Sequence, residues 1–513
     1  MIRKITFLVF LFLAVNSCNE EATQQESLAQ PIVEGQSAAP LPKSEINQFI
    51  ERQLYRHNKF EWNMGDVNLI WSASVQSDSL MAIGYKPAKE QRVEDRLHLI
   101  NIQTPEWQRV RQSIIDLVVR ETNREFPGNN FSSRDLMPLP DSEILPAIDI
   151  KIFSPTIIQK LREMPEVRYV EPLGYSPEGG LRSDSGCGVT PATSIPAADY
   201  TTISPSVKQS WHQTAMNIPG AWSQSTGSGI TVALLDTGTS PNQAKLNGEF
   251  NSGQSSGRTH ERLGTYVSCW FCGTPDGPND GCGHGTQMAG LIAAPRGSGG
   301  TAVGAAYNCN LLSIRVTSDV VINGSSEKTG VANGLTIAAN RSNVKIISMS
   351  IGDVISTSRV SDAVKYAYGK GKLIFAAAGT SLSWTSWWGV IFPANMAECV
   401  AITGVKDGLP LEKCNTCHEG SKVDFVVVMQ RRSDTNRTAL SLALSGNTPA
   451  YVGGSSAATA TTAGIAAQVW ATNPSMTRDQ VLTKLKNASS LYPSRNANLG
   501  WGIIDASSAV AGI

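Results

Sequence analysis

The chain has 513 residues, and at about 150 residues per domain this length predicts two or three units. Hydrophobic residues make up 41% and charged residues 17%, which is typical of a globular protein and argues against a disordered one. Lysine plus arginine and aspartate plus glutamate both number 43, so no net charge attracts nucleic acid or another acidic surface. The composition therefore argues against a nucleic-acid-binding protein.

The N-terminus has the pattern of an export signal. Two basic residues precede the apolar run 5–15, which is too short to span a bilayer and fits the core of a signal peptide. Residues 15–18 then resemble the lipobox of bacterial lipoproteins, in which the cysteine is lipidated and becomes the new N-terminus. We therefore expect a signal peptide over 1–17, a lipid anchor at Cys18 as the only membrane contact, and a flexible tether over 18–45. The alternative is an ordinary signal peptide that contains a cysteine by chance.

Residues 46–172 lack cysteine and end in a predicted strand, helix and strand. Apolar residues alternate over 148–152, which predicts a half-buried strand. A serine followed by a proline then predicts a helix over 155–163, because the serine caps the helix and the proline needs no N–H there. A second strand is predicted over 167–170. The stretch 173–205, rich in Gly, Ser, Pro and Thr, is predicted to be a linker.

Residues 206–513 alternate between short apolar runs and helices made of small residues. This is the pattern of a parallel sheet covered by helices on both faces. The predicted strands lie at 230–235, 311–316, 344–347 and 373–377, and the predicted helices at 331–339 and 360–368. We therefore predict an α/β domain whose functional groups gather at the carboxyl ends of the strands.

Eight cysteines remain when Cys18 is set aside, and all of them belong to the C-terminal part of the chain: Cys187, Cys269, Cys272, Cys282, Cys309, Cys399, Cys414 and Cys417. An even number in an exported chain predicts disulfide bonds, although the sequence does not choose among the pairings. The two CxxC pairs, 269–272 and 414–417, could instead supply four thiolates to a zinc ion.

Three residues of the C-terminal part are candidates for nucleophilic catalysis. Such chemistry needs a hydroxyl that attacks, an imidazole that takes its proton, and a carboxylate that holds the imidazole. Asp236 ends the predicted strand 230–235, and His284 lies between two glycines at the start of a small-residue helix. Ser456 opens another helix, which presents its hydroxyl outward and turns its backbone N–H toward a developing oxyanion.

The sequence around these candidates resembles the subtilase family. The family's aspartate, histidine and serine motifs are matched in chain order by 232–238, 283–290 and 454–464. The spacing within the third motif identifies Ser456 rather than Ser455 as the nucleophile. The resemblance covers about 205–513 and implies a subtilisin-like three-layer α/β fold. It also implies a secreted serine endopeptidase that cleaves proteins or peptides through an acyl-enzyme, with the three candidates as its triad.

The same resemblance implies further roles. The end of 46–172 is similar to the close of the inhibitory propeptide of these enzymes, which implies a small α+β propeptide domain, a zymogen, and cleavage within 173–205. Cleavage before Cys187 would release the mature enzyme from the cell envelope. No cofactor is implied, and calcium, which the family often binds, finds no compact acidic loop here. The residues implied to bind substrate are Ser350, Ile351, Gly352, Ala378 and Gly379.

One position departs from the family in a way that bears on catalysis. Thr380 stands where the family has the asparagine of the oxyanion hole, and our hypothesis is that it partly replaces this donor. Three tryptophans follow, at 384, 387 and 388. They either bind apolar side chains of a substrate or pack on the surface of the domain.

Two other functions remain as alternatives. The sequence at 236–239 resembles an aspartic-protease signature, but such enzymes need a second carboxylate, and the only other short match, 184–186, lies in a polar linker. A subtilase-like module that binds peptides without cutting them is supported only by Thr380. A dinucleotide-binding enzyme is excluded, because no Gly-rich turn with a correctly spaced acidic residue follows the first strand.

Overall fold

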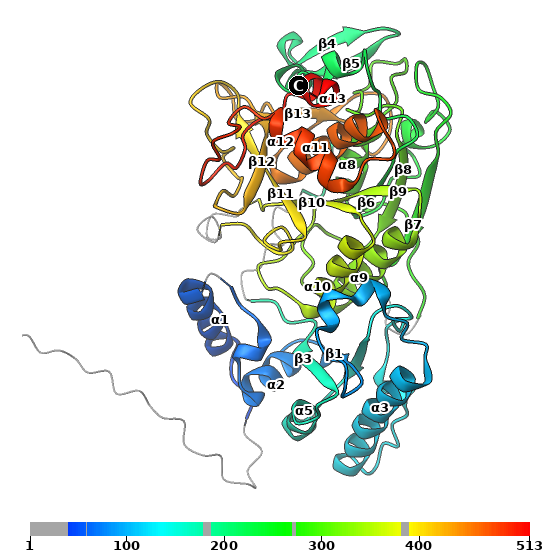
Figure 1. The fold of residues 1–513 in the computed structure, drawn as a ribbon, viewed down its shortest axis with the longest axis vertical. Coiled ribbons are helices and arrows are strands. Elements are labelled where there is room, and N and C mark those ends of the chain that lie inside the picture. Colours follow the sequence, from blue (N-terminus) through cyan, green and yellow to red (C-terminus); the bar gives the residue numbers. More distant parts are fainter. Residues whose placement is uncertain (1–38, 58, 178–185, 269–272, 381–388, 513) are drawn as a thin grey trace, which may run out of the picture. The chain divides into compact units, whose positions relative to one another are not determined.

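The computed structural model describes residues 39–57, 59–177, 186–268, 273–380 and 389–512 (Figure 1). The predictions for the signal peptide, the lipidated cysteine, most of the tether, the first CxxC pair and the three tryptophans lie outside these residues. Within the described ranges, no helix combines the length and the apolar character needed to cross a membrane. The helices and strands all belong to one unit, Pro40–Ile513.

The largest sheet has seven strands, and every pairing within it is parallel. The order is β12-β11-β10-β9-β6-β8-β7, and the bounds are β6 (Thr231–Asp236), β7 (His260–Gly264), β8 (Asn310–Arg315), β9 (Val344–Met349), β10 (Leu373–Ala377), β11 (Cys399–Lys406) and β12 (Val423–Gln430). The four strands predicted from apolar runs are β6, β8, β9 and β10, so the prediction of a parallel α/β sheet is confirmed.

Helices cover both faces of this sheet (Figure 1). Successive residues of a strand point to opposite faces, and β6 shows the consequence. Val232 and Leu234 belong to the core that contains α8 and α11, whereas Ala233 and Leu235 belong to the core that contains α9 and α10. The bounds are α8 (His284–Ala293), α9 (Ser325–Asn340), α10 (Ser358–Gly369) and α11 (Gly454–Ala471). The chain therefore forms the three layers expected of a subtilisin-like fold.

Smaller elements complete this part of the chain. The described residues also form the antiparallel pairs and short helices β4 (Tyr200–Ile203) with β5 (Val207–Ser210), β13 (Ala439–Ser441) with β14 (Ala450–Val452), α6 (Trp211–Ala215), α7 (Ile218–Ala221), α12 (Arg478–Asn487) and α13 (Ala506–Ala511). The strand β4 lies at the end of the predicted linker.

The N-terminal region is a smaller α+β arrangement. Its three-stranded antiparallel sheet has the order β2-β1-β3, and the elements are α1 (Lys43–His57), α2 (Val67–Val75), β1 (Leu80–Tyr85), α3 (Pro105–Glu125), α4 (Ser133–Leu136), β2 (Ala147–Lys151), α5 (Pro155–Arg162) and β3 (Val167–Pro172). The predicted strand, helix and strand are β2, α5 and β3. The cap predicted for α5 is present, because the Ser154 hydroxyl accepts a hydrogen bond from the backbone N–H of Thr156. Helix α1 begins before the end of the predicted tether.

Buried ion pairs join this N-terminal region to helix α10. Two guanidinium nitrogens of Arg168, in β3, donate to the two carboxylate oxygens of Asp362 at 2.9 Å each. Asp149, in β2, lies 3.3 Å from the guanidinium of Arg359. The side chains of all four residues are at most 5% exposed. Each side of the contact contributes one acid and one base.

Three neighbouring strands deliver functional residues to one edge of the large sheet. Asp236 is the last residue of β6, Ser350 directly follows β9, and Ala377 ends β10. Because β6, β9 and β10 are adjacent and parallel, their carboxyl ends meet. The site is built at this edge.

Candidate active site

Asp236 and His284 are joined directly. The Oδ1 atom of Asp236 lies 2.8 Å from Nδ1 of His284, and the two side chains are only 1% and 5% exposed. The contact depends on Gly285, because a Cβ there would lie 2.1 Å from the carbonyl oxygen of Gly238. A glycine after the histidine therefore lets helix α8 approach the end of β6 closely enough for the two side chains to meet.

A second buried carboxylate, that of Asp280, organises the start of helix α8. It accepts five hydrogen bonds of 2.6–2.9 Å, and each donor lies directly after Asp236 or within two residues of His284: the hydroxyls of Thr237 and Thr286 and the backbone N–H groups of Cys282, Gly283 and Thr286. Sequence analysis missed this residue. An acidic residue just before a helix start is the signal that could have revealed it.

The surrounding carboxylates favour the charged form of the imidazole. Burial of the His284 ring opposes charging, but the charge and hydrogen bond of Asp236 outweigh burial, with help from Asp280 and Asp319. The net effect raises the pKa of His284 above its usual value. Such an environment stabilises an imidazolium at the moment it forms.

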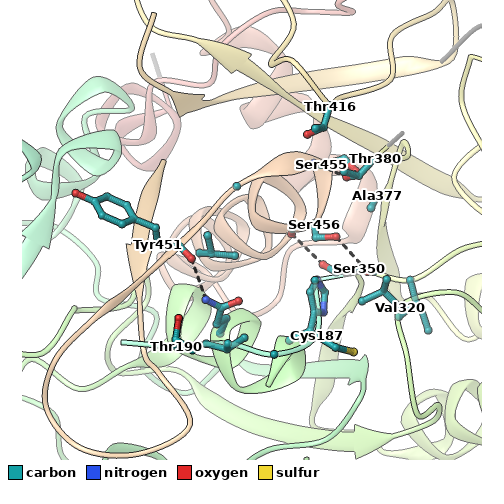
Figure 2. Close-up of a pocket in the computed structure, with 18 of the residues that line it drawn as sticks. Cys187, Thr190, Val320, Ser350, Ala377, Thr380, Thr416, Tyr451, Ser455 and Ser456 are labelled. Atoms are coloured by element: carbon teal, nitrogen blue, oxygen red, sulfur yellow. Dashed lines mark hydrogen bonds between the residues drawn. The ribbon is translucent and has the colours of Figure 1, made fainter. Parts of the chain in front are cut away.

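Ser456 lies in the first turn of helix α11 and contacts the end of β9. Its hydroxyl donates to the carbonyl oxygen of Ser350 at 3.2 Å, and the Ser350 hydroxyl donates back to the carbonyl oxygen of Ser456 at 2.9 Å (Figure 2). Ser455, by contrast, is 1% exposed and its hydroxyl accepts from the N–H of Gly379. These placements support Ser456 as the nucleophile.

A cavity of about 750 Å³ contains the candidate nucleophile and the candidate base. Among the residues predicted to bind substrate, Ser350, Ile351, Gly352 and Gly379 line it. Ala378 does not fit this role, because it is buried and its N–H and carbonyl groups are already bonded to Ile402 and Ile391.

The backbone of Gly352, one of the residues implied to bind substrate, is already hydrogen-bonded within the chain. The N–H of Gly352 donates to the carbonyl of Val320 at 3.1 Å, and the N–H of Ile322 donates to the carbonyl of Gly352 at 3.1 Å. An extended substrate can therefore pair with Gly352 only if the segment 320–322 moves aside. Sequence reasoning did not identify this segment.

Thr380 lies beside the start of helix α11. Its hydroxyl is 3.0 Å from the Ser455 hydroxyl and accepts from the backbone N–H of Ser455 at 3.3 Å. Either hydroxyl can be the donor in the contact with Ser455, so the Thr380 hydroxyl can donate to an oxyanion when Ser455 supplies the hydrogen of that contact.

A stretch of the predicted linker also reaches the site. Residues 186–194 line the cavity, and a disulfide bond joins Cys187 to Cys282, two residues before His284. In Figure 2, Cys187 and Thr190 lie across the cavity from Thr380 and Thr416. The even cysteine count predicted disulfides, but only the fold shows that this one is at the active site.

The remaining described cysteines have different states. Cys414 and Cys417 form a disulfide bond, so they are not thiolates available to zinc, and the zinc alternative is wrong for this pair. Cys309 and Cys399 are free and buried. Within the described ranges, no group of three or more His, Cys, Asp or Glu side chains is arranged to hold a metal ion.

Known proteins resemble both the sequence and the fold. Thermitase from Thermoactinomyces vulgaris is 34% identical over 163 residues, which cover 32% of this chain and 52% of thermitase. Subtilisin Savinase from Lederbergia lenta is 29% identical over 300 residues, covering 58% of this chain and 97% of Savinase. The structure of fervidolysin from Fervidobacterium pennivorans, described as a keratinolytic enzyme related to subtilisin, shares the fold with a TM-score of 0.58. That match has 17% identity and covers 85% of this chain and 61% of fervidolysin.

The fold and these relatives define the class of protein, a serine-type endopeptidase of the subtilisin kind. The Subtilase family, Peptidase S8, matches residues 227–502, which is more than half of the chain. The chain belongs to this family.

Proposed function

We propose that the chain cleaves proteins or peptides with Ser456 as nucleophile, His284 as general base and Asp236 as the group that orients the imidazole. The single observation that carries the proposal is the buried 2.8 Å contact between Asp236 and His284 at the wall of the cavity that also contains Ser456. In the mechanism, rotation of the Ser456 hydroxyl from the Ser350 carbonyl toward His284 starts the reaction. His284 takes the hydroxyl proton, the serine oxygen attacks the scissile carbonyl, and the amine leaves with the proton from the imidazolium. Water then attacks the acyl-enzyme with His284 again acting as base.

Cleavage of casein by the purified protein tests this assignment. We expect Ser456→Ala to lower kcat by about 10⁶-fold, because a serine triad acts as a unit. Ser455→Ala is the matched control, since it removes a neighbouring hydroxyl and should leave measurable cleavage. Equal and negligible cleavage by the wild type and Ser456→Ala would instead favour a module that binds peptides without cutting them.

For the oxyanion, the proposed donors are the backbone N–H of Ser456 and, in part, the hydroxyl of Thr380. The first lies at the N-terminus of helix α11, where partial positive charge favours an anion. Removal of one working donor costs about 10²–10³ in turnover, so Thr380→Ala should lower kcat by up to about 10²-fold. Thr380→Ser, which keeps the hydroxyl, should retain most of the activity. An unchanged kcat in Thr380→Ala would remove this residue from the mechanism.

The N-terminal region is proposed to be an inhibitory propeptide. Its support is the set of buried contacts with helix α10, to which Glu171 adds another: its carboxylate accepts the backbone N–H of Ser358 at 2.6 Å, in the first turn of that helix. Beyond β3, Ser176 accepts a hydrogen bond from Asn323, near the Val321 wall of the cavity, and Gly186 lines the same cavity. Gly186 therefore lies at the cavity wall, and Ser176 contacts a residue two positions beyond the lining residue Val321, which supports a cut in this part of the chain during maturation.

Export, a lipid anchor at Cys18 and cleavage within 173–205 complete the proposal. The support is the lipobox-like sequence and the relatedness to subtilisins and alkaline proteases. N-terminal sequencing of the wild type and of Ser456→Ala tests autocatalysis. Identical processing of both proteins would show that another protease performs the cut.

A further inference from the structure

The side of the cavity that must receive the leaving group can be identified from the proposed chemistry. His284 delivers a proton to the departing amine, so substrate residues after the scissile bond have to pass beside the imidazole. The resemblance to subtilases assigns the substrate residues before that bond to Ser350 and Ile351, which line the same cavity. The leaving-group side is therefore the part of the cavity next to His284.

The segment 186–194 occupies the boundary of this part. A Cβ added to Gly186 would lie 3.1 Å from Cδ2 and 4.0 Å from Nε2 of His284, so the backbone passes against the edge of the ring that faces the reaction. Val189 packs against the residue just before His284, because a Cβ on Gly283 would lie 2.7 Å from a Val189 methyl carbon. Cys187 and Thr190 are both part of the cavity wall (Figure 2).

This segment is held in place at its start and in its middle, and the chain that follows it is also fixed. At the first end, Cys187 is bonded covalently to Cys282, and the N–H of Gly188 donates to the Cys282 carbonyl at 3.0 Å. In the middle, the N–H of Ala192 donates to the carbonyl of Pro449 at 2.9 Å.

Five residues beyond the segment, Asp199 is fully buried. Arg437 donates to its carboxylate at 2.6 and 2.8 Å, and the Tyr451 hydroxyl donates at 2.7 Å. A linker fixed in this way behaves as part of the catalytic domain.

The wall that this segment forms carries no charged side chain. The segment contributes only uncharged side chains, and the same cavity is also lined by Gln287, Tyr451, Val452 and Gly453. Apart from His284, the described residues that line the whole cavity include no lysine, arginine, aspartate or glutamate. None of these described lining residues would compensate the burial of a charged substrate residue.

We propose that residues 187–194, fixed by the Cys187–Cys282 disulfide, are a permanent wall of the leaving-group subsites that selects substrates with small, uncharged residues after the scissile bond. The inference rests on the proposed triad. It also means that a cut before Gly186 frees the N-terminal region but leaves the wall in place. A cut between Cys187 and Asp199 would leave the N-terminal region attached through the disulfide.

The test uses pairs of quenched-fluorescence peptides that share the residues before a bond cleaved in casein and differ after it. One peptide continues with Gly-Ala-Ser and the other with Trp-Lys-Trp. We expect the wild type to prefer the first in kcat/KM by about tenfold or more, a factor typical of pocket contacts. The double variant Cys187→Ser/Cys282→Ser should bring this ratio close to one. Thr190→Trp narrows the cavity and leaves the Cys187–Cys282 disulfide intact. This variant should raise the ratio of the two kcat/KM values about tenfold further.

Thr202→Trp is the matched control, because Thr202 is exposed on β4 of the same stretch and does not line the cavity. Its ratio should equal that of the wild type. If a folded double variant keeps the wild-type ratio, or if Thr190→Trp shifts the ratio no more than Thr202→Trp does, the wall is not a specificity element. If the double variant does not fold, Thr190→Trp decides alone. Failure of the proposed triad gives a different result, because the wild type and Ser456→Ala would then leave both peptides uncut, and both proposals would fall.

Discussion

Two regions of this molecule bury carboxylates and use them in opposite ways. Where the N-terminal region meets helix α10, Asp149 and Asp362 are paired with arginines that come from the other side of the contact. Around the active site, Asp236 and Asp280 are paired with hydroxyls, backbone N–H groups and the imidazole of His284, all within residues 206–513.

The two arrangements differ in what happens to the carboxylate when the N-terminal region separates from the rest of the chain. An ion pair between two segments loses its partner when the segments separate, and both charges can then be hydrated by water. A carboxylate bonded to its own backbone keeps its partners in every state in which the domain is folded. The first arrangement suits a contact that has to be released, and the second suits a site that must keep its geometry.

The largest expected effect comes from breaking the contact with α10. Arg168→Ala should destabilise the docked N-terminal region by about 3–5 kcal/mol, because it leaves Asp362 buried without its cation. The measurement is urea-dependent hydrogen exchange of the N-terminal amides in the Ser456→Ala protein, which cannot process itself. Arg96→Ala removes an exposed pair with Glu90 on the same region and should cost no more than about 1 kcal/mol. Equal effects of the two variants would show that the buried pair does not stabilise docking.

The next largest effect is expected at the active site, from a change to the buried carboxylate of Asp280. Asp280→Asn should lower kcat by about 10- to 100-fold, because the amide nitrogen cannot accept the hydrogen bonds that fix the start of α8. Catalysis needs the neutral imidazole, and the Asp280 charge contributes to the raised pKa of His284. Loss of that charge should therefore lower this pKa and move the acid limb of kcat/KM to lower pH. Asp276→Asn, in the same loop, is the control. A lower kcat with an unshifted acid limb would leave Asp280 a purely structural role.

The smallest effect concerns pH at the contact with α10. Burial raises the pKa of Glu171 to about 7, although hydrogen bonds from Thr357 and Ser358 oppose the shift. A carboxyl group whose pKa is higher in the docked state takes up a proton on docking, so docking is favoured below this pKa and weakens as the pH rises through it. Between pH 6 and pH 8 the docking equilibrium should fall by about tenfold. Glu171→Gln should remove this dependence. The hydrogen-exchange measurement described for Arg168→Ala follows docking here too. If the pH dependence of docking persists in Glu171→Gln, another group causes it.

Local sequence patterns predicted much of the secondary structure and the candidate triad. Short apolar runs with small-residue helices between them predict a buried parallel sheet, because each strand needs apolar residues on both faces, and β6, β8, β9 and β10 were found from this pattern. The capping pair at Ser154 and Pro155 located the start of α5. The candidate triad could be named because each member lies at the end of a predictable element.

What the tertiary structure decided concerns contacts between distant segments. Asp280, the hydrogen-bonded backbone of Gly352, the burial of Ala378 and the position of Cys187 against the loop before His284 all depend on packing between parts that are far apart in the chain. A side chain's hydrogen-bond partners and solvent exposure are set by those neighbours, and no local pattern contains them. For this protein, the sequence by itself determined which residues could perform the chemistry, and only the fold determined which groups surround them and which surface a substrate meets.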